Sequence, residues 1–226
     1  MLFTSEVRSS DSSFVQAIWR TQSQGTGSFL SPAAIHWDML LMRYRGKTTF
    51  TVQGPETKAT RASVPADAEW LGITFQLGTF MPDLLPIRLL DRHDVNLSEA
   101  TGKSFWLSGS TWELPTYENA DTFVYRLMRA GLLVRDPLFD LLMQVDQPNL
   151  SARALQYRFR QATGLTHKTV QQIQRAQQAA TLLEQGYPIL DTASQLGYFD
   201  QSHLTNSLRR YIGQTPAQIS RAQHME

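Results

Sequence analysis

The feature that most constrains the fold of this chain is an internal repeat in its second half. The segments LSARALQYRFRQATG (residues 150–164) and FDQSHLTNSLRRYIG (residues 199–213) align without a gap at an offset of 49 residues. Leu155 aligns with Leu204, and in each copy an apolar residue follows four positions later, the spacing that places side chains on one face of a helix. The repeat therefore predicts two similar helices, each with one buried face.

The opposite face of each predicted helix is polar. Positions i, i+3, i+4 and i+7 form one stripe along a helix, and no stripe position in either copy is a carboxylate. The stripes comprise Arg153, Gln156, Tyr157 and Arg160 in the first copy and Ser202, Thr205, Asn206 and Arg209 in the second. Hydrogen-bonding and cationic groups of this kind suit contact with nucleic acid, although a solvated helix face has a similar composition.

A short helix is predicted in front of each copy. The segments DPLFDLLMQV and YPILDTASQLG each carry proline at their second position, and proline is favoured in the first turn of a helix. Ser151 and Asp200 then stand where the N-caps of the two repeated helices are expected. A short helix, a turn and a helix with an exposed polar stripe predict a helix-turn-helix, here over about residues 137–164 and again over 188–213.

A longer helix is predicted between the two units, over about residues 166–185. Its sequence, THKTVQQIQRAQQAATLLEQG, contains no internal glycine or proline. About 19 helical residues span roughly 28 Å, which is of the order of one turn of DNA, about 34 Å. We therefore expect the two polar stripes to enter successive major grooves and to read half-sites about one helical turn apart.

The charge of the chain is divided unevenly. Residues 1–147 hold 13 Lys and Arg against 16 Asp and Glu, a net of −3, whereas residues 148–226 hold 8 against 4, a net of +4. A basic C-terminal third favours a polyanionic partner, although such a charge is also ordinary for a small domain.

Several other classes of protein conflict with the sequence. The chain has no cysteine, which excludes disulfides and thiolate catalysis, and its five histidines are scattered without metal-ligand spacing. It has no apolar run long enough to cross a membrane and no recognisable signal peptide, so a cytoplasmic location without membrane attachment is expected. Neither a phosphate-binding glycine loop nor a nucleophile elbow is present, so no catalytic residue, cofactor or metal is predicted.

The first half of the chain has the pattern of β-strands. GKTTFTVQG and EWLGITFQLG alternate polar and apolar residues, and glycine and proline are frequent between such segments. We expect an α+β chain of two domains: a β-rich domain like a barrel or sandwich over residues 1–118, and an all-α domain over 119–226. Four tryptophans of the first half, Trp37, Trp70, Trp106 and Trp112, fit either its core or the lining of a ligand cavity.

The second half resembles a known family in its motifs. LSARALQYRFRQATGLTHKTV, followed by ILDTASQLGYFDQSHLTNSLRRYIGQTPAQI, is similar to the DNA-binding domain of the AraC/XylS family of bacterial transcription regulators. The matched pattern runs from the glycine and aromatic residue at 197–198, through the acidic residue and SH at 200–203, to the basic helix end and the G-x-T-P at 213–216. The resemblance covers roughly residues 119–221, and the first half resembles the family's sensor domains only loosely.

This resemblance and the stripes together assign candidate contacts with DNA. The base-reading candidates are Arg153, Gln156, Tyr157, Gln201, Ser202, Thr205 and Asn206, and the phosphate-binding candidates are Arg160, Lys168, Arg209 and Arg210. Tyr157 and Asn206 occupy positions that are often basic in the family. Because Asn pairs best with adenine and Arg with guanine, this departure concerns the DNA sequence that is read.

The expected function is therefore sequence-specific binding of double-stranded promoter DNA by a transcription regulator. Its first domain is expected to respond to a small-molecule effector, whose binding residues the sequence does not identify, or to form a homodimer; RNA polymerase is a further candidate partner. A DNA alkyltransferase built on a similar domain would need a nucleophilic cysteine, which this chain lacks. The remaining alternative is a β-barrel protein or enzyme acting on a small molecule, with the helical half as a scaffold.

Overall fold

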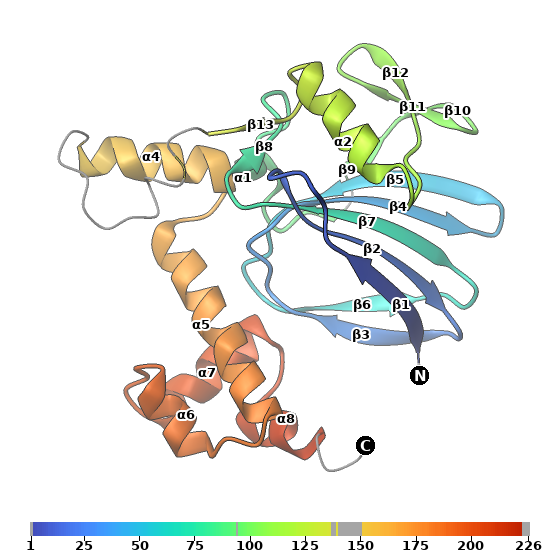
Figure 1. Cartoon of the computed structure of the whole chain (residues 1–226). Helices are drawn as coiled ribbons and strands as arrows, with labels where there is room; N and C mark the ends of the chain where they lie inside the picture. The colour runs from blue at the N-terminus through green and yellow to red at the C-terminus, as the bar shows by residue number, and fades with distance from the viewer. Residues whose placement is uncertain (1, 94, 137–138, 140–150, 223–226) are drawn as a thin grey trace. The chain divides into compact units, whose positions relative to one another are not determined.

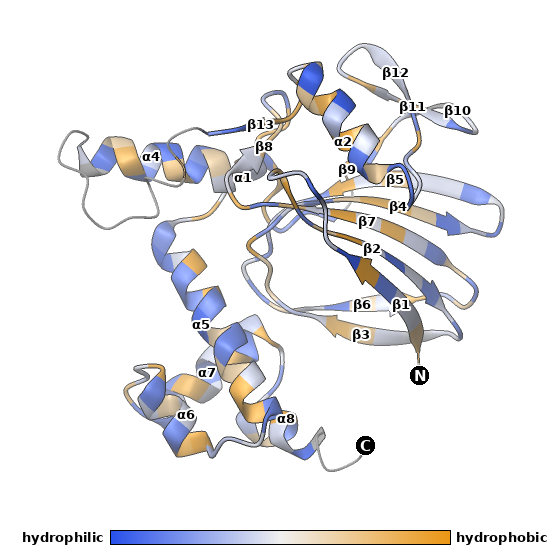
Figure 2. Cartoon of the chain, viewed as in Figure 1, coloured by the Kyte–Doolittle hydropathy of each residue, from blue (hydrophilic) through white to orange (hydrophobic). Residues whose placement is uncertain are grey.

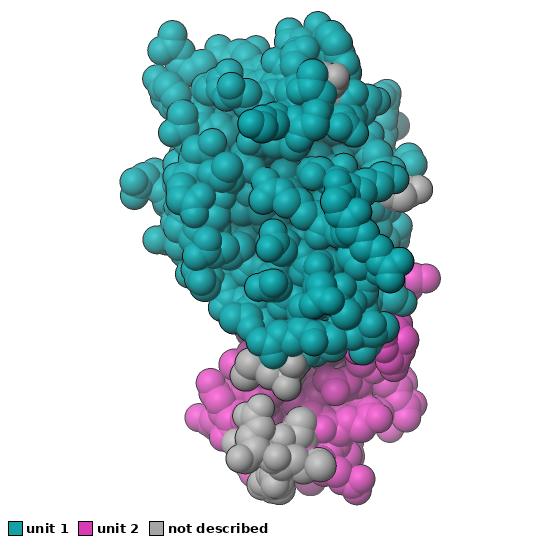
Figure 3. Space-filling view, turned by 90° about the vertical axis from the view of Figure 1, so that its right-hand side faces the viewer, with its two compact units in different colours: residues 1–27, 36–55, 63–166 teal, residues 28–35, 56–62, 167–226 magenta. Residues whose placement is uncertain are grey.

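The computed structural model describes residues 2–93, 95–136, 139 and 151–222 (Figure 1). These residues form two compact units, coloured separately in Figure 3. Unit 1 consists of residues 1–27, 36–55 and 63–166, and unit 2 of residues 28–35, 56–62 and 167–226. The division differs from a single boundary near residue 118, because two short segments of the first half belong to unit 2 and the first repeated helix belongs to unit 1.

Unit 1 is built on an antiparallel sheet of six strands in the order β1-β2-β7-β4-β5-β9. Their bounds are β1 (Phe3–Arg8), β2 (Val15–Ser23), β7 (Glu69–Phe75), β4 (Asp38–Tyr44), β5 (Lys47–Gln53) and β9 (Val95–Leu97). The two segments with alternating polar and apolar residues form β5 and β7, which confirms that part of the sequence prediction. Alternation places one set of side chains on each face of the sheet.

Of the two forms expected for this β-rich domain, barrel or sandwich, a closed barrel is not found in the described residues. Among the described residues β1 and β9 are the two edges of the main sheet and do not pair with each other, so the sheet is open. Helix α2 (Ala120–Arg129) and the small sheet β10 (Glu99–Thr101), β11 (Ser104–Leu107) and β12 (Ser110–Glu113) supply the apolar side chains that bury its inner face. The core joins Ile18, Met39 and Ile73 of the sheet to Phe105 and Leu127 of that cover. The β-rich first half followed by helices is confirmed.

Smaller elements complete unit 1. Strand β8 (Thr79–Phe80) pairs with β13 (Val134–Arg135), a strand that the purely helical prediction for the second half did not include. Helix α1 (Pro86–Leu89) and helix α4 (Ala152–Thr163), the first repeated helix, also belong to this unit.

Unit 2 contains the helices α5 (His167–Glu184), α6 (Ile189–Gln195), α7 (Gln201–Tyr211) and α8 (Pro216–Ala222). Hydrophobic and hydrophilic segments alternate along α5, the predicted linker helix (Figure 2). Its apolar row, including Ile173 and Leu183, is fully buried, as is Leu204 of α7. Most of β3 (Gly27–Ser31) and part of β6 (Thr60–Val64), which pair with each other, also belong to this unit.

None of the helices in the described parts of the chain is long and apolar enough to cross a lipid bilayer.

Candidate nucleic-acid interface

Helix α4 begins and ends as the repeat predicts. The Ser151 hydroxyl accepts a hydrogen bond from the Ala154 N–H at 3.2 Å, which makes Ser151 its N-cap. At the other end Gly164 has a φ of 74°, and its N–H donates to the Arg160 carbonyl at 2.8 Å. A left-handed residue at this position suits glycine, because a Cβ would be strained there.

The polar stripe of α4 faces solvent. Arg153, Gln156, Tyr157 and Arg160 are all exposed, and Tyr157 retains 65% of its accessible surface. None of these four side chains hydrogen-bonds to another described residue, so their polar groups are available to an external partner. The buried face carries Phe159, whose ring stacks on that of Phe139 with centroids 5.7 Å apart. The short helix predicted over 137–145 lies outside the described residues except for Phe139.

Helix α7 has an acidic N-cap. The Asp200 carboxylate accepts a hydrogen bond from the His203 N–H at 2.7 Å. The His203 ring meets the Tyr198 ring edge-to-face at 5.2 Å, and its Nδ1 accepts a hydrogen bond from the Phe199 N–H at 3.4 Å. These contacts give His203 a role in the turn of the motif.

The side chains in the polar stripe of α7 are mostly shorter than those in the stripe of α4. Gln201, Ser202 and Asn206 are exposed, and Thr205 is half-buried. The Thr205 hydroxyl donates to the Gln201 carbonyl at 2.8 Å, so its oxygen remains available as an acceptor. Arg209 and Arg210 are exposed in the last turn, where the Arg210 guanidinium lies 5.1 Å from the centre of the Tyr211 ring.

Lys168 is exposed in the first turn of α5. The 18 residues of α5 match the predicted linker helix closely. Because α4 lies in unit 1 and α7 in unit 2, a spacing of one DNA turn between the two stripes remains a prediction.

One residue beside the second stripe is not predicted by the sequence pattern. Phe199 lies in the turn between α6 and α7 and is 94% exposed, the largest value among the exposed large apolar residues of the described chain. An aromatic side chain left in water next to a helix N-terminus is a candidate contact for an apolar group of a partner. The repeat did not reveal it, because Phe199 aligns with Leu150, another apolar residue, and neither position belongs to a polar stripe.

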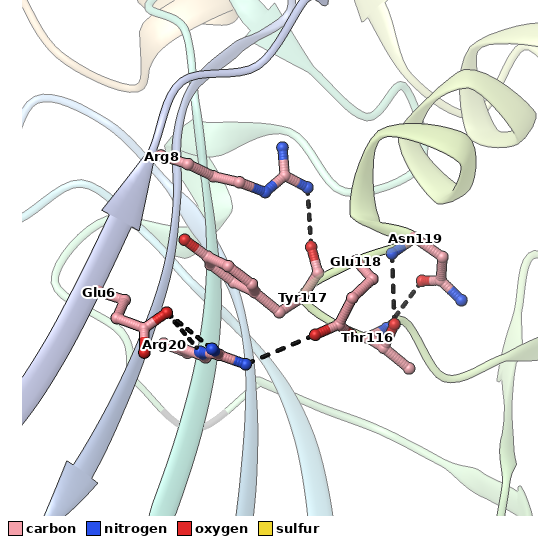
Figure 4. Close-up of polar contacts among 7 residues, drawn as sticks. All are labelled: Glu6, Arg8, Arg20, Thr116, Tyr117, Glu118 and Asn119. Carbon is pink, nitrogen blue, oxygen red and sulfur yellow. Dashed lines mark hydrogen bonds and ion pairs between the residues drawn. The ribbon is translucent and has the colours of Figure 1, made fainter.

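Unit 1 contains a cleft of about 460 Å³ on its main sheet, between strands β1, β2, β7 and β4 and the segment before α2. Its lining includes Glu6, Arg20, Arg43, Trp70 and Tyr117. Figure 4 shows the polar contacts at one side of it. The cleft thus joins residues from five separate parts of the sequence.

Two arginines line this cleft, and only one of them is engaged in hydrogen bonds and ion pairs with the described residues. Arg20 donates to Glu6 at 2.7 and 3.0 Å and lies 3.5 Å from a Glu118 carboxylate oxygen, with its guanidinium 4.5 Å from the centre of the Tyr117 ring. The hydrogen bond to Glu6 raises the pKa of Arg20 above its ordinary value. Arg43 makes no hydrogen bond or ion pair with the described residues. Its guanidinium is therefore available to a ligand.

One of the four tryptophans has the expected core position. Trp37 is 4% exposed and stacks on Phe75 with ring centroids 4.0 Å apart, while its indole N–H donates to the Thr79 carbonyl at 2.7 Å. Trp37 is therefore a core residue. The Trp70 ring meets the Phe3 ring edge-to-face, with centroids 6.3 Å apart, on the face of the main sheet opposite Leu71 and Arg43.

Comparison with known proteins supports the assignment of the helical part. Residues 145–222 match the model of a helix-turn-helix domain family. No curated protein matches the chain. Solved structures of ToxT from Vibrio cholerae are similar over nearly their whole length. A 1.65 Å structure has 11% identity, a TM-score of 0.39 and coverage of 100% of this chain and 99% of that one.

A second ToxT structure, from Vibrio cholerae O395 with bound (E)-4-(8-methylnaphthalen-1-yl)but-3-enoic acid, has 10% identity and a TM-score of 0.40, with 100% of this chain and 99% of that chain covered. These overall likenesses are weak. The prediction of a helix-turn-helix in the second half is confirmed by the family match, which covers the second predicted helix-turn-helix (188–213) completely and the first (137–164) from residue 145.

Proposed function

We propose that the chain is a DNA-binding transcription regulator of the AraC type and that α4 and α7 are its two reading helices. The match of residues 145–222 to a helix-turn-helix domain family supports this proposal. The observation that carries the proposal is the repetition of one design: each helix has a side-chain N-cap, a buried apolar face and an exposed polar stripe. Such a helix presents base-reading groups to the major groove while its cap fixes where it begins.

Long side chains dominate the readout by α4. Arg153 and Gln156 each offer two hydrogen-bonding groups to a base edge, a geometry that suits guanine and adenine respectively. Tyr157, exposed beside them, reaches a thymine methyl or a phosphate.

Readout by α7 depends on shorter groups. Asn206 is suited to a bidentate contact with adenine, and Gln201, Ser202 and Thr205 supply further contacts to base edges. Phe199 lies next to this stripe and adds an apolar contact to a thymine methyl or a deoxyribose.

Phosphate contacts come from the cations at the margins of the stripes. Arg160, Arg209 and Arg210 lie in the last turns of their helices and Lys168 in the first turn of α5, and all four are exposed. Phosphate contacts orient a protein on DNA without specifying a sequence.

Fluorescence anisotropy with a mixed-sequence duplex at several salt concentrations tests this proposal. Arg209→Ala is expected to weaken binding to all sequences similarly and to flatten the plot of log affinity against log salt by about one unit, the effect of one lost phosphate contact. Arg129→Ala, which removes an exposed arginine from α2 of unit 1, is the matched control and is expected to leave the slope unchanged. Identical slopes for the two variants contradict the assignment of Arg209.

We propose that the cleft of unit 1 receives the effector. It combines the apolar side chains of Leu41 and Leu71, the ring of Tyr117, and the available guanidinium of Arg43. A small molecule with an apolar body and an anionic group fits this combination, because a few placed polar groups and an apolar lining are typical of ligand sites.

Thermal-shift measurements with a panel of small carboxylates, amines and neutral compounds test the cleft. We expect carboxylates to raise the Tm of the wild type, and Arg43→Ala to abolish that shift. Arg45→Ala changes an exposed arginine in the adjoining turn, outside the cleft lining, and is expected to keep it. A shift that survives in Arg43→Ala places the ligand elsewhere.

The proposal also includes a regulatory rather than an enzymatic role, a cytoplasmic location, and contacts with RNA polymerase or a second copy of the chain at the promoter. Mass photometry of the protein with and without its selected duplex measures the last of these directly.

A further inference from the structure

The end of reading helix α7 is capped by residues of the first half of the chain. The last carbonyl groups of a helix have no partner within the helix and need one elsewhere. The Ala59 N–H donates to the Arg210 carbonyl at 2.8 Å, and the Ala33 N–H donates to the Tyr211 carbonyl at 2.7 Å. Residues 28–35 and 56–62, which we call the ribbon, all belong to unit 2 together with α7.

The ribbon is itself held in place. Ala34 and Glu56 exchange two backbone hydrogen bonds, at 3.2 and 2.8 Å, which tie its two segments together. The Gln177 side-chain amide of α5 donates to the Ala33 carbonyl at 3.0 Å. Ala33 is 1% exposed, so these bonds are shielded from water. The ribbon therefore presents backbone N–H donors to α7 in fixed positions.

The glycine after α7 leaves room for the ribbon. Gly213 has a φ of 82°, and a Cβ built on it would lie 3.1 Å from both the Ala59 Cβ and a Leu30 methyl. A side chain at this position would push against the ribbon in addition to straining the backbone. Close packing and two hydrogen bonds thus act on the same turn of α7, which carries Arg209 and Arg210.

We propose that the ribbon is a positioning element for DNA reading by α7. Residues Ala33 and Ala59 fix the last turn of the helix and so aim its stripe at the bases. The inference rests on the proposed function of α7. It assigns to the ribbon, which is part of the first half of the chain, a role in that function. The ribbon continues along the chain into His36 and follows Pro55, so the segments that lead to β4 and from β5 of unit 1 are covalently joined to the ribbon, which in turn holds the end of α7 by hydrogen bonds.

The test removes one donor from the ribbon in the full chain. Ala59→Pro deletes the N–H that caps Arg210, whereas Ala59→Gly keeps it and is the matched control. A duplex is first selected from a randomised pool by the wild type, and a second duplex is made with the α7 half-site scrambled. We expect Ala59→Pro to bind the intact duplex about fivefold more weakly, the effect of one net hydrogen bond, and to bind the scrambled duplex as the wild type does.

A purely structural role for the ribbon gives a different pattern. In that case Ala59→Pro lowers the Tm but weakens binding to both duplexes equally, and the positioning inference is overturned. A milder pair of variants guards against misfolding: Gln177→Ala removes the amide bond to Ala33, and Gln178→Ala changes its exposed neighbour on α5. Only the first is expected to reduce the preference for the intact duplex, and equal effects of the two overturn the inference.

The inference and the proposed function fail in separate ways. If the wild type selects no duplex from the pool, the proposed function fails. If it selects one and neither Ala59→Pro nor Gln177→Ala changes the ratio of the two affinities, α7 reads DNA without help from the ribbon.

Discussion

The two repeated helices have the same construction and different surroundings. Both α4 and α7 begin at a side-chain cap and are followed by a glycine with positive φ, Gly164 and Gly213. A Cβ on Gly164 would lie 2.8 Å from the Pro86 carbonyl group, which is backbone, whereas a Cβ on Gly213 would meet only side chains of the ribbon. One local pattern is thus fitted into two different tertiary sites, each built by the first half of the chain.

Substitution of the two glycines is expected to have the largest effect. Gly164→Ala adds a clash with backbone to the strain of a left-handed alanine, for a loss of about 3 kcal/mol in the free energy of unfolding. Gly213→Ala is expected to cost less, because Leu30 can shift. Gly197→Ala, with φ of 68° and no atom within 4 Å, measures the backbone strain by itself, about 1 kcal/mol. Urea denaturation gives the three values, and equal losses contradict the contact with Pro86.

Base preference separates the two helices next. Arg153→Ala is expected to relax selection at one base pair of the α4 half-site, a loss of roughly 1–3 kcal/mol of discrimination, without changing the α7 half-site. Asn206→Arg is expected to shift preference from adenine toward guanine in the α7 half-site. Randomised-site selection compares base frequencies position by position. If both variants lose affinity evenly at all positions, these residues orient the protein without reading bases.

The two N-caps are expected to differ in strength. The Asp200 carboxylate accepts a hydrogen bond from a backbone N–H at 2.7 Å, whereas the neutral Ser151 hydroxyl accepts one at 3.2 Å. Because charge-assisted bonds near a helix N-terminus are stronger, Asp200→Ala is expected to cost about 1–2 kcal/mol and Ser151→Ala about 0.5–1 kcal/mol. Hydrogen exchange of the first-turn amides measures both, and a larger effect at Ser151 reverses the order.

Acid is expected to weaken unit 1, which holds α4, through His36. Burial lowers the pKa of His36, although the hydrogen bond with the Phe75 carbonyl at 2.8 Å opposes the effect. The folded state therefore binds its proton less readily than the unfolded state. Stability is fully present above the ordinary histidine pKa of about 6.5 and declines as the pH falls below it toward the folded value.

Urea denaturation between pH 7.5 and 5 measures this decline, and His36→Gln is expected to reduce it. The Asp121 carboxylate contributes to the pH dependence of stability only at lower pH. Burial would raise the pKa of Asp121, but hydrogen bonds from Ser10 and Arg8 outweigh burial and lower this pKa. Unchanged pH dependence in His36→Gln assigns the decline to other groups.

Local patterns in the sequence were sufficient for much of this fold. Alternation over a few residues predicted β5 and β7, and the repeat with its caps predicted α4, α5, α6 and α7. The stripe residues of α4 and α7 were identified in the same way, and the structure leaves most of them exposed. Each of these features depends on residues at most seven positions apart, and the repeat only shows the same local pattern twice, so the sequence displays them directly.

Tertiary structure decided the rest. Nothing local marks Ala33 and Ala59 as partners of α7, because both are small residues whose function lies in their backbone N–H groups. The cleft likewise combines Arg20, Arg43, Leu71 and Tyr117 through strand order and register, and the open sheet depends on α2 covering its apolar face. Pairings across more than a hundred residues are set by packing of the whole chain, and a sequence pattern with a period of two or 3.6 residues carries no record of them.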